Sequence, residues 1–463
     1  MEMKSQREQF ASRAGFILMA AGCAIGLGNV WRFSYIAGEY GGGFFVLLYL
    51  LFLVILGFPV MLMELAVGRA GRSTFPEAFR KLQPANSRFP WHKPVFVFFS
   101  GNLILLMFYS VITGWLLVYA AGYLKGSFKN ITPEQSAGFF SNMLADPVTQ
   151  TIGMLSAVLL TVTVCLGGLR KTIEKVIKIM MAGLFVLLLL LVFQALSLPD
   201  AAKGVGFFLK PDWGKFLGDG VLNTIHAAMA QAFFTLSLGV GSMAICGSYT
   251  SDNNSLAKDG LWILLLDTVV AVFSGLIIFP VCASFSISPN AGPPLIFITL
   301  PNVFANMQYA AVWGFLFFLF LAIAALSTLI AVFENLVAFG IDHWHWSRKR
   351  SGGIFAIILT VFSMPCIFGF NLLKKFQPLG PGSNVLDLED FIVSDNLLPL
   401  GALYIVIFCT SRYGWGKENL RKEISNGSGW KIPRGLDFYL RWVLPVLILT
   451  IWFIGIAKRF KLF

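Results

Sequence analysis

Charged residues are unusually scarce in this sequence. Only 13% of its 463 residues are Asp, Glu, Lys or Arg, whereas 57% are apolar. A soluble domain has about twice that charged fraction, and long apolar runs recur here along the whole chain. This pattern excludes a soluble globular protein and predicts a polytopic membrane protein embedded in a lipid bilayer. We expect no cleavable signal, because the first apolar run is too long for one.

Reactive and metal-binding side chains are also few and scattered. The six cysteines stand singly in apolar segments without any C-x-x-C pair, so we expect small buried hydrophobes. The four histidines form no ligand set. No nucleophile–base pair or metal triad is recognisable, and the sequence therefore predicts no enzyme.

Acidic residues are outnumbered, and the net charge is +12. This excess does not indicate a nucleic-acid partner, because the charges lie in short loops between apolar runs. There they act as topology signals and contact lipid head groups. With the N-terminus in the cytoplasm, most Lys and Arg fall on the cytoplasmic side, as the positive-inside rule requires. Lys458, Arg459 and Lys461 conflict with this orientation.

Long apolar runs are abundant. They predict an all-α fold class with about 11 transmembrane helices. We predict a first half over residues 1–198, a second half over 221–411 and an additional helix over 437–457. The predicted spans are 13–37, 41–68, 95–124, 148–167, 175–198, 221–248, 260–284, 311–341, 353–371, 392–411 and 437–457.

Two of these spans are interrupted by glycine pairs. Gly26 and Gly28 weaken the first span, and Gly239 and Gly241 weaken the sixth. Backbone groups freed at membrane depth are tolerated where they line a polar cavity, although glycine pairs also serve close helix packing. An odd number of spans separates the two breaks, so the halves form a 5+5 inverted repeat. Paired breaks of this kind indicate a transporter's binding site in the middle of the membrane.

Several longer motifs follow one another along the chain. They are Ala24-Ile-Gly-Leu-Gly-Asn-Val-Trp-Arg-Phe33, Gly41-Gly-Gly, Pro59-Val-Met-Leu-Met-Glu64, Phe108-Tyr-Ser-Val-Ile-Thr-Gly-Trp115, Phe233-Phe-Thr-Leu-Ser-Leu-Gly239 and Ser274-Gly-Leu-Ile-Ile-Phe-Pro280. In these motifs the sequence resembles the neurotransmitter:sodium symporter family over nearly the whole chain. The absence of a twelfth helix is similar to the eleven-span bacterial members that carry hydrophobic amino acids. The resemblance implies a multi-pass protein of a bacterial inner (plasma) membrane that imports hydrophobic or aromatic L-amino acids with sodium by alternating access.

The resemblance implies two sodium ions, each held by oxygen atoms. The first ion would bind the Ala24 carbonyl, the side chains of Asn29, Thr235 and Asp267, and the carboxylate of the substrate. Asp267 replaces an asparagine of the family's bacterial leucine transporter and adds a negative charge, so we expect no chloride requirement. Ala271 stands where animal relatives have their chloride-binding serine. Asp267 could instead be a buried acid paired with a polar neighbour, although an acid inside a membrane is functional by default.

The second ion would bind the carbonyls of Gly22, Ile25 and Ala324 and the hydroxyls of Ser327 and Thr328. Adjacent Ser and Thr in an apolar helix can also simply bond to the preceding turn.

The resemblance also implies a substrate site at the two breaks. Freed amides at Leu27 and Gly28 suit a carboxylate. Gly26 stands where monoamine transporters carry aspartate, so the ligand is expected to bring its own carboxylate. Ser237 and carbonyls near Phe234 would receive the ammonium group. The expected binding residues are Gly26, Leu27, Gly28, Leu105, Tyr109, Phe234, Ser237, Val240, Thr328, Ala331 and Val332. Their side chains are mostly apolar and imply a broad preference for hydrophobic substrates.

Gates are implied on both sides of this site. Outside, Arg32 would face Asp390, with Asp387, Glu389 and Asp395 as alternatives. Inside, Arg7 would pair with Asp342, assisted by Ser248 and Tyr249. Thr172 and Ala182 replace the Gly-x9-Pro pattern that lets the fifth helix unwind in related bacterial members, so the inner water path is expected to open differently.

Two other classes of protein remain as alternatives. A channel or a receptor-like sensor could use the same broken helices to bind a ligand without moving it, and uphill accumulation in proteoliposomes would distinguish them. The sequence leaves the oligomeric state open, with a monomer as one possibility.

Overall fold

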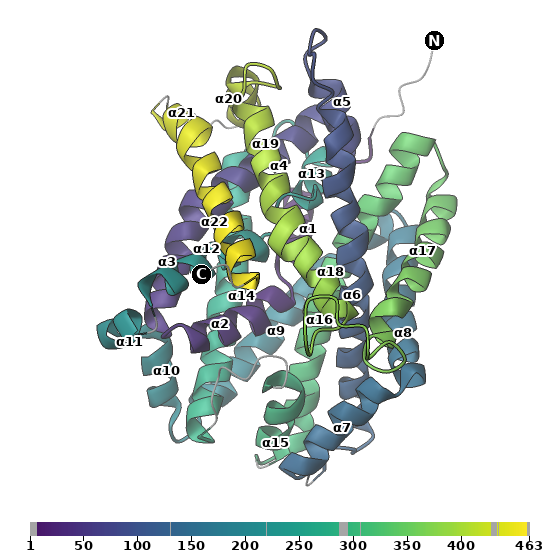
Figure 1. Ribbon diagram of the computed structural model, residues 1–463. Helices are drawn as coiled ribbons and strands as arrows, with labels where there is room; N and C mark the ends of the chain where they lie inside the picture. The colour runs from purple at the N-terminus through teal and green to yellow at the C-terminus, as the bar shows by residue number, and fades with distance from the viewer. Residues whose placement is uncertain are drawn as a thin grey trace.

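The computed structural model describes residues 7–460 except 130, 219, 287–294, 306, 427–432 and 434. The described chain is a bundle of long helices, with short helices at both ends (Figure 1). The spanning helices are α1 (Arg13–Ala24) with η1 (Gly28–Arg32) and α2 (Phe33–Glu39), α3 (Gly43–Phe52) with η2 (Leu53–Gly57) and α4 (Phe58–Gly71), α6 (His92–Leu124), α8 (Pro147–Leu166), η3 (Leu169–Ile173) with α9 (Glu174–Leu196), α12 (Val221–Thr235) with α13 (Ser242–Ser248), α14 (Leu256–Ser284), α16 (Ala310–Trp344), α17 (Arg348–Phe368), α18 (Val385–Asp390) with η5 (Phe391–Leu397) and α19 (Leu398–Thr410), and α21 (Leu436–Phe438) with η6 (Tyr439–Val443) and α22 (Leu444–Arg459).

The all-α membrane fold predicted from the sequence is confirmed. Within the described residues, 9 helices are long and apolar enough to cross a membrane, and α1 with α2 forms a tenth span bent by 57°. The pair α12 and α13 supplies the remaining predicted span, but six non-helical residues divide it into halves too short to count separately.

Connecting segments between the spans form short helices. Most of them lie at the two ends of the bundle (Figure 1). These helices are α5 (Phe75–Leu82), α7 (Pro133–Ala145), α10 (Ala201–Leu209), α11 (Trp213–Gly218), η4 (Leu295–Thr299) with α15 (Leu300–Ala305), and α20 (Lys417–Ser425).

Several predicted helix starts were wrong by a turn or two. The tenth span begins at Val385 rather than 392, because Asn384 and Asp387 form a reciprocal capping box in front of it. The seventh and ninth spans begin at Leu256 and Arg348, each capped by a serine hydroxyl. Polar and charged first turns look like loop in the sequence, yet they are helical because the caps satisfy their free amides.

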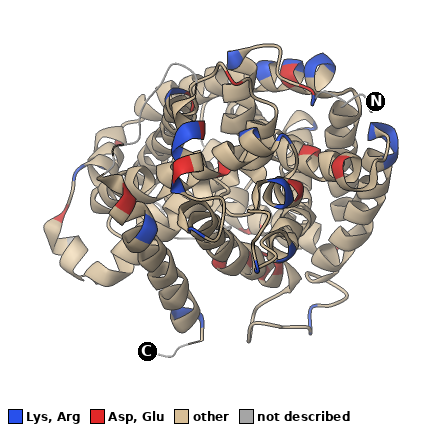
Figure 2. Cartoon of the chain, turned by 90° about the horizontal axis from the view of Figure 1, so that it is seen from above, with Lys and Arg blue, Asp and Glu red and all other residues tan. Residues whose placement is uncertain are grey.

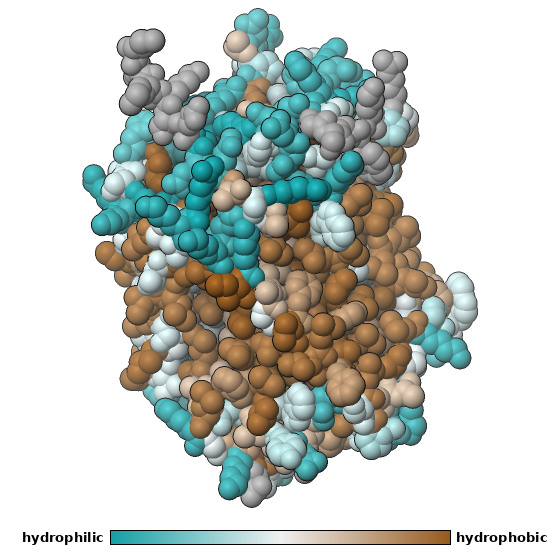
Figure 3. Space-filling model, turned by 180° about the vertical axis from the view of Figure 1, so that it is seen from behind, coloured by the Kyte–Doolittle hydropathy of each residue, from teal (hydrophilic) through white to brown (hydrophobic). Residues whose placement is uncertain are grey.

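The surface separates into an apolar belt and two polar ends. Figure 3 shows the belt as a broad brown band between teal ends. Large apolar side chains on the outer helices are exposed, such as Leu159, Ile179 and Phe193. Lys and Arg are spread over the end at which the N-terminus lies (Figure 2). We call this the basic end; α5, the first turn of α17 and α20 lie there (Figure 1).

Three helices that pack on many neighbours, α6, α1 and α4, lie in the interior of the bundle. α6 packs against α16, α8 and α17, while α1 packs against α16, α9 and α14. α4 lies against α13 and α14. All six cysteines are free and buried, as the sequence predicts, and they lie in α1, α8, α13, α14, α17 and α19.

Candidate functional site

Both predicted helix breaks are present. α1 ends at Ala24, the backbone of Ile25 is extended, and η1 begins at Gly28. Between α12 and α13, the φ angles of Ser237, Gly239 and Gly241 are 50°, 100° and 85°. Positive φ is strained for most residues but not for glycine, which explains the glycine pair in the sixth span. The breaks leave amides and carbonyls without helical partners in the middle of the protein.

Polar side chains from neighbouring helices bind these freed backbone groups. Glu64 on α4 accepts hydrogen bonds from the amides of Gly239 (3.0 Å) and Met243 (3.1 Å). Asn102 on α6 donates to the Val240 carbonyl at 2.7 Å. The break in the sixth span is thus held at both its amides and its carbonyls, as a buried backbone requires.

Two further amide side chains bind the breaks in the same way. Asn335 on α16 donates to the Gly241 carbonyl at 3.2 Å, and Gln231 on α12 donates to the Gly28 carbonyl at 3.0 Å. Sequence reasoning did not single out Asn102, Asn335 or Gln231. The available signal was a lone amide side chain inside an apolar helix.

The first predicted sodium cluster is assembled around Asp267. The Asn29 side-chain amide donates to the Asp267 carboxylate (2.8 Å) and to the Thr235 hydroxyl (2.9 Å), which in turn donates to Asp267 at 3.0 Å. Tyr49, which the sequence analysis did not name, donates to the same carboxylate at 3.4 Å. All four side chains are buried. Ala24 lines the small cavity beside this cluster.

The second predicted cluster is gathered around Thr328. Its hydroxyl lies 3.1 Å from the Ile25 carbonyl, 3.2 Å from that of Gly22 and 3.4 Å from that of Ala324. The Ser327 hydroxyl donates to the Ala324 carbonyl at 2.8 Å. The contacts to Gly22 and Ile25 cross from α16 to α1, so they are more than bonds to the preceding turn.

The chemistry of both clusters suits a small hard cation. No group of three His, Cys, Asp or Glu side chains that could hold a metal is found in the part of the chain that the structure describes. The clusters consist instead of carbonyl and hydroxyl oxygens with one carboxylate, which are the ligands that hard cations prefer. Their low formal charge fits a monovalent ion better than a divalent one.

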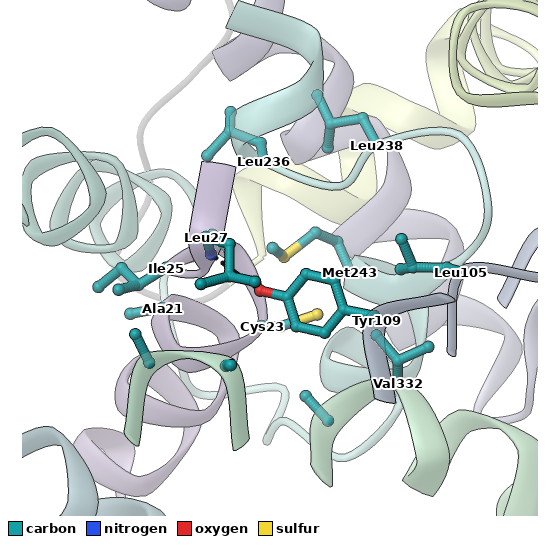
Figure 4. Packing of buried hydrophobic residues seen from close by; sticks show 14 of the residues in the cluster. Ala21, Cys23, Ile25, Leu27, Leu105, Tyr109, Leu236, Leu238, Met243 and Val332 are labelled. Atoms are coloured by element: carbon teal, nitrogen blue, oxygen red, sulfur yellow. Dashed lines mark hydrogen bonds between the residues drawn. The ribbon is translucent and has the colours of Figure 1, made fainter. Parts of the chain in front are cut away.

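Between the clusters lies a small cavity of about 20 Å³, lined in part by Gly26, Gly28, Leu105, Phe234 and Ser237. The Leu27 amide donates to the Tyr109 hydroxyl at 2.8 Å. Figure 4 shows the Tyr109 ring pointing at Leu27, with Leu105 and Val332 beside it. The volume is enough for roughly one water molecule. A larger ligand requires side chains to move.

The lining differs from the predicted pocket in a few residues. Tyr109 and Thr328 line the cavity as expected, while Val240, Ala331 and Val332 are buried without lining it. Leu398, at the start of α19, also lines the cavity and was not predicted to do so. Leu398 lies inside the predicted span 392–411, and nothing distinguishes it there from the other apolar residues of that span.

At the basic end, the predicted inner gate residues are in contact. Arg7 forms an ion pair with Asp342, donates to the Ser248 hydroxyl at 3.1 Å and lies over the Tyr249 ring at 4.6 Å. The Phe10 ring packs edge-on against Tyr249 at 6.0 Å. Burial by itself would lower the pKa of Arg7, but Tyr249 and Asp342 raise it overall. Arg7 therefore stays charged at physiological pH.

The inner gate continues into a network that the sequence did not predict. The Tyr249 hydroxyl donates to Glu334 at 2.8 Å. Arg348 donates twice to the same carboxylate, at 2.7 and 2.8 Å. This bidentate geometry is strong and specific. It ties the start of α17 to α16 directly beneath the gate.

At the opposite end, the predicted outer pair is not joined. Arg32 lies over the Phe234 ring at 4.1 Å, and within the described residues no ion pair links it to Asp390. Asp390 accepts a hydrogen bond from Ser394 instead. Of the alternative acids, Asp395 lies within electrostatic reach of Arg32. Arg32 and Phe234 together cover the cavity.

The structure is that of a helical membrane protein in which two clusters of oxygen atoms lie beside a cavity between broken helices. The chain belongs to the sodium:neurotransmitter symporter family, whose model matches residues 7–141 and 134–462. It is therefore a sodium-coupled, multi-pass membrane transporter of a small molecule and not an enzyme.

Individual relatives agree with this assignment. An uncharacterized sodium-dependent transporter, YhdH of Bacillus subtilis (strain 168), is 34% identical over 445 residues, covering 96% of each chain. Another from Haemophilus influenzae (strain Rd) is 29% identical and covers 96% of this chain and 97% of its own. The crystal structure of MhsT in complex with L-phenylalanine superposes with a TM-score of 0.86 at 36% identity, covering 97% of this chain and 99% of that one.

Proposed function

We propose that this symporter imports hydrophobic and aromatic L-amino acids together with two sodium ions and without chloride. The contact between the Leu27 amide and the Tyr109 hydroxyl carries the proposal. The amide donates to the hydroxyl in this contact, and it places two groups that could donate to a carboxylate beside Gly26, where a Cβ atom would lie 2.4 Å from the Tyr109 oxygen. An aspartate has no room there, so the substrate must supply the carboxylate.

The side-chain preference follows from the apolar residues around the cavity. Leu105, Phe234 and Leu398 line it, and Val332 lies beside Tyr109 (Figure 4). Because the cavity holds roughly one water molecule, an amino acid enters only when Phe234 swings outward and carries Arg32 with it. L-phenylalanine in the similar MhsT structure supports an aromatic ligand of this size.

The ions would bind the two oxygen clusters. In the first, the Asn29 amide group must turn so that its oxygen, rather than its nitrogen, faces the ion beside Asp267. The carboxylate then balances the charge of the ion, which makes a chloride ion unnecessary. Thr328 would contribute to the second ion and to the substrate pocket at once, and so would couple them.

Transport would proceed by alternating access between two inverted halves, residues 1–198 and 221–411. The first, second, sixth and seventh spans would rock as a bundle against a scaffold of the third, fourth, eighth and ninth. The inner contact between Arg7 and Asp342 would close one side while the lid of Arg32 and Phe234 opens on the other. Sodium and substrate drive this cycle only if each binds one state more tightly than the other.

Sodium-driven uptake in proteoliposomes tests the proposal. Radiolabelled phenylalanine should accumulate against its own concentration gradient only when an inward sodium gradient is imposed. Among the twenty amino acids, the hydrophobic and aromatic ones should compete best with it. Competition by small polar amino acids alone would refute the substrate assignment. Binding without uphill accumulation would indicate a sensor or channel instead.

A variant of Asp267 tests the role assigned to its charge. Asp267→Asn keeps the hydrogen-bonding shape but removes the charge, so we expect sodium affinity to fall by about tenfold or more. Chloride should leave wild-type uptake unchanged. Unaltered uptake by Asp267→Ala at low sodium would show that this site binds no coupling ion.

A further inference from the structure

A groove at the basic end is not part of the transport site. It has a volume of about 820 Å³ and lies between the start of α6 and the end of α19, so we call it the α6–α19 groove. Its lining is mainly apolar and aromatic, with two arginines. The lining residues are Pro84, Asn86, Ser87, Arg88, Phe89, Trp91, Tyr404, Ile407, Ser411, Arg412 and Tyr413.

The walls of the groove are fixed by hydrogen bonds and ring contacts. The Trp91 indole donates to the Tyr413 carbonyl at 2.7 Å, and the Tyr404 hydroxyl donates to the Trp91 carbonyl at 2.7 Å. The rings of Trp91 and Tyr404 lie 5.4 Å apart, and those of Trp91 and Phe89 lie 5.0 Å apart. The groove is therefore preformed and does not depend on a ligand for its shape.

One side of the groove opens toward the bilayer. Ile407, which lines the groove from α19, is 38% exposed. Val97, in the second turn of α6, is 59% exposed. Exposed apolar side chains on spanning helices face acyl chains. Tryptophan and tyrosine beside them are typical of the depth of lipid head groups.

The other side carries positive charge that the protein does not neutralise. Arg88 and Arg412 are both exposed, and the structure gives neither an acidic partner among the residues it describes. Arg412 instead lies over the Tyr413 ring at 4.7 Å. Guanidinium groups match the geometry of phosphate and bind it through two parallel hydrogen bonds.

We propose that the α6–α19 groove binds an anionic phospholipid from the leaflet at the basic end. The phosphate lies between Arg88 and Arg412, and an acyl chain runs along Tyr404 and Ile407 into the bilayer. The apolar wall favours a lipid over a free phosphate, because a soluble anion would leave that wall uncovered. Basic pockets at this depth are suited to anionic head groups.

Lipid titration of the purified protein, followed by native mass spectrometry, tests the proposal. Phosphatidylglycerol should bind more tightly than phosphatidylcholine with the same acyl chains. The double variant Arg88→Gln/Arg412→Gln should bind phosphatidylglycerol about 30-fold more weakly, since each basic group near a head group contributes about fivefold. Its affinity for phosphatidylcholine should not change.

Two further variants separate the groove from general electrostatics. Lys349→Gln/Lys422→Gln removes two exposed charges from the same end, outside the groove, and should stay within about twofold of the wild type. Ile407→Trp fills the apolar part and should weaken phosphatidylglycerol binding while both arginines remain. Equal losses in both double variants would overturn the proposal, as would undiminished binding by Ile407→Trp.

Inorganic phosphate serves as the competing probe. It should not displace phosphatidylglycerol at millimolar concentration. Displacement by phosphate alone would overturn the lipid assignment and identify a site for a soluble anion.

Discussion

Gly26 is the residue whose side chain, a single hydrogen, matters most at the binding site. A Cβ atom there would lie 2.4 Å from the Tyr109 hydroxyl and 2.9 Å from that of Thr328, and both distances are too short for a real contact. The neighbouring groups would have to move, although they are the expected anchors of the carboxylate and of the second ion. This position therefore couples backbone packing directly to ligand recognition.

The variant Gly26→Ala should lower substrate affinity by about fivefold or more, because overpacking of this kind costs about 1 kcal/mol or more. Equilibrium binding of radiolabelled phenylalanine measures the effect. Gly183→Ala on α9 is the matched control, since a Cβ atom there meets nothing within 4 Å. Equal affinities of the two variants would contradict the assigned role.

The grouping of site residues was predictable where a side chain was unusual for a membrane, whereas their roles stay predictions. Asn29, Thr235, Asp267 and Thr328 are polar groups in apolar helices, and the structure brings them together as two clusters. Leu398 was not predictable, because an apolar residue in an apolar helix has no distinguishing signal. Only the three-dimensional path of α19 places it at the cavity.

At the scale of elements, the break in the sixth span depends on a side chain from the second. Glu64 accepts hydrogen bonds from the amide of Gly239, inside the break, and from the amide of Met243, in the first turn of α13. Glu64→Ala leaves both amides buried without an acceptor and should cost roughly 2–5 kcal/mol of stability. Thermal unfolding in detergent should show a lower midpoint. The exposed Glu418→Ala on α20 should leave the midpoint unchanged, and an equal midpoint in both variants would argue against the capping role.

The proposed inner gate joins the segment before α1 to the end of α16. Removing Arg7 deletes the contacts with Asp342, Ser248 and the Tyr249 ring at once. We expect Arg7→Ala to open this end more often and to raise the maleimide labelling rate of Cys246 several-fold, when Cys246 is the sole remaining cysteine. Lys171→Ala removes an exposed charge at the same end and should not raise the rate. Because Arg7 stays charged, the ratio of the labelling rates of Arg7→Ala and the wild type should be the same at every pH between 6 and 9.

At the scale of the whole molecule, orientation in the membrane is still a prediction. Lys and Arg gather at the end that carries the N-terminus (Figure 2), which the positive-inside rule assigns to the cytoplasm. An impermeant thiol reagent should label Asn86→Cys only after cells are opened, but Lys374→Cys in intact cells. The unmodified chain is the control, since all six native cysteines are buried. The reverse pattern would place the N-terminus outside.

The overall architecture was predictable because hydropathy determines it. Apolar length set the number of spans, and the paired glycines located both breaks. Helix starts were less predictable: the charged first turn of α17 and the acidic α18 look like loop, and only their caps make them helical. The salt bridge between Glu334 and Arg348 was not predicted, since nothing local in the sequence pairs two residues on different helices, α16 and α17.

The hydrogen bonds that hold the sixth span's break have a kinetic consequence. Asn102 on α6 and Asn335 on α16 belong to the proposed scaffold, yet they donate to carbonyls of Val240 and Gly241 in the proposed moving bundle. In the proposed cycle, each turnover breaks and remakes these bonds inside the buried core, where the low dielectric makes a hydrogen bond strong. Transport should consequently slow steeply on cooling, with a large activation enthalpy that shrinks when either amide is removed.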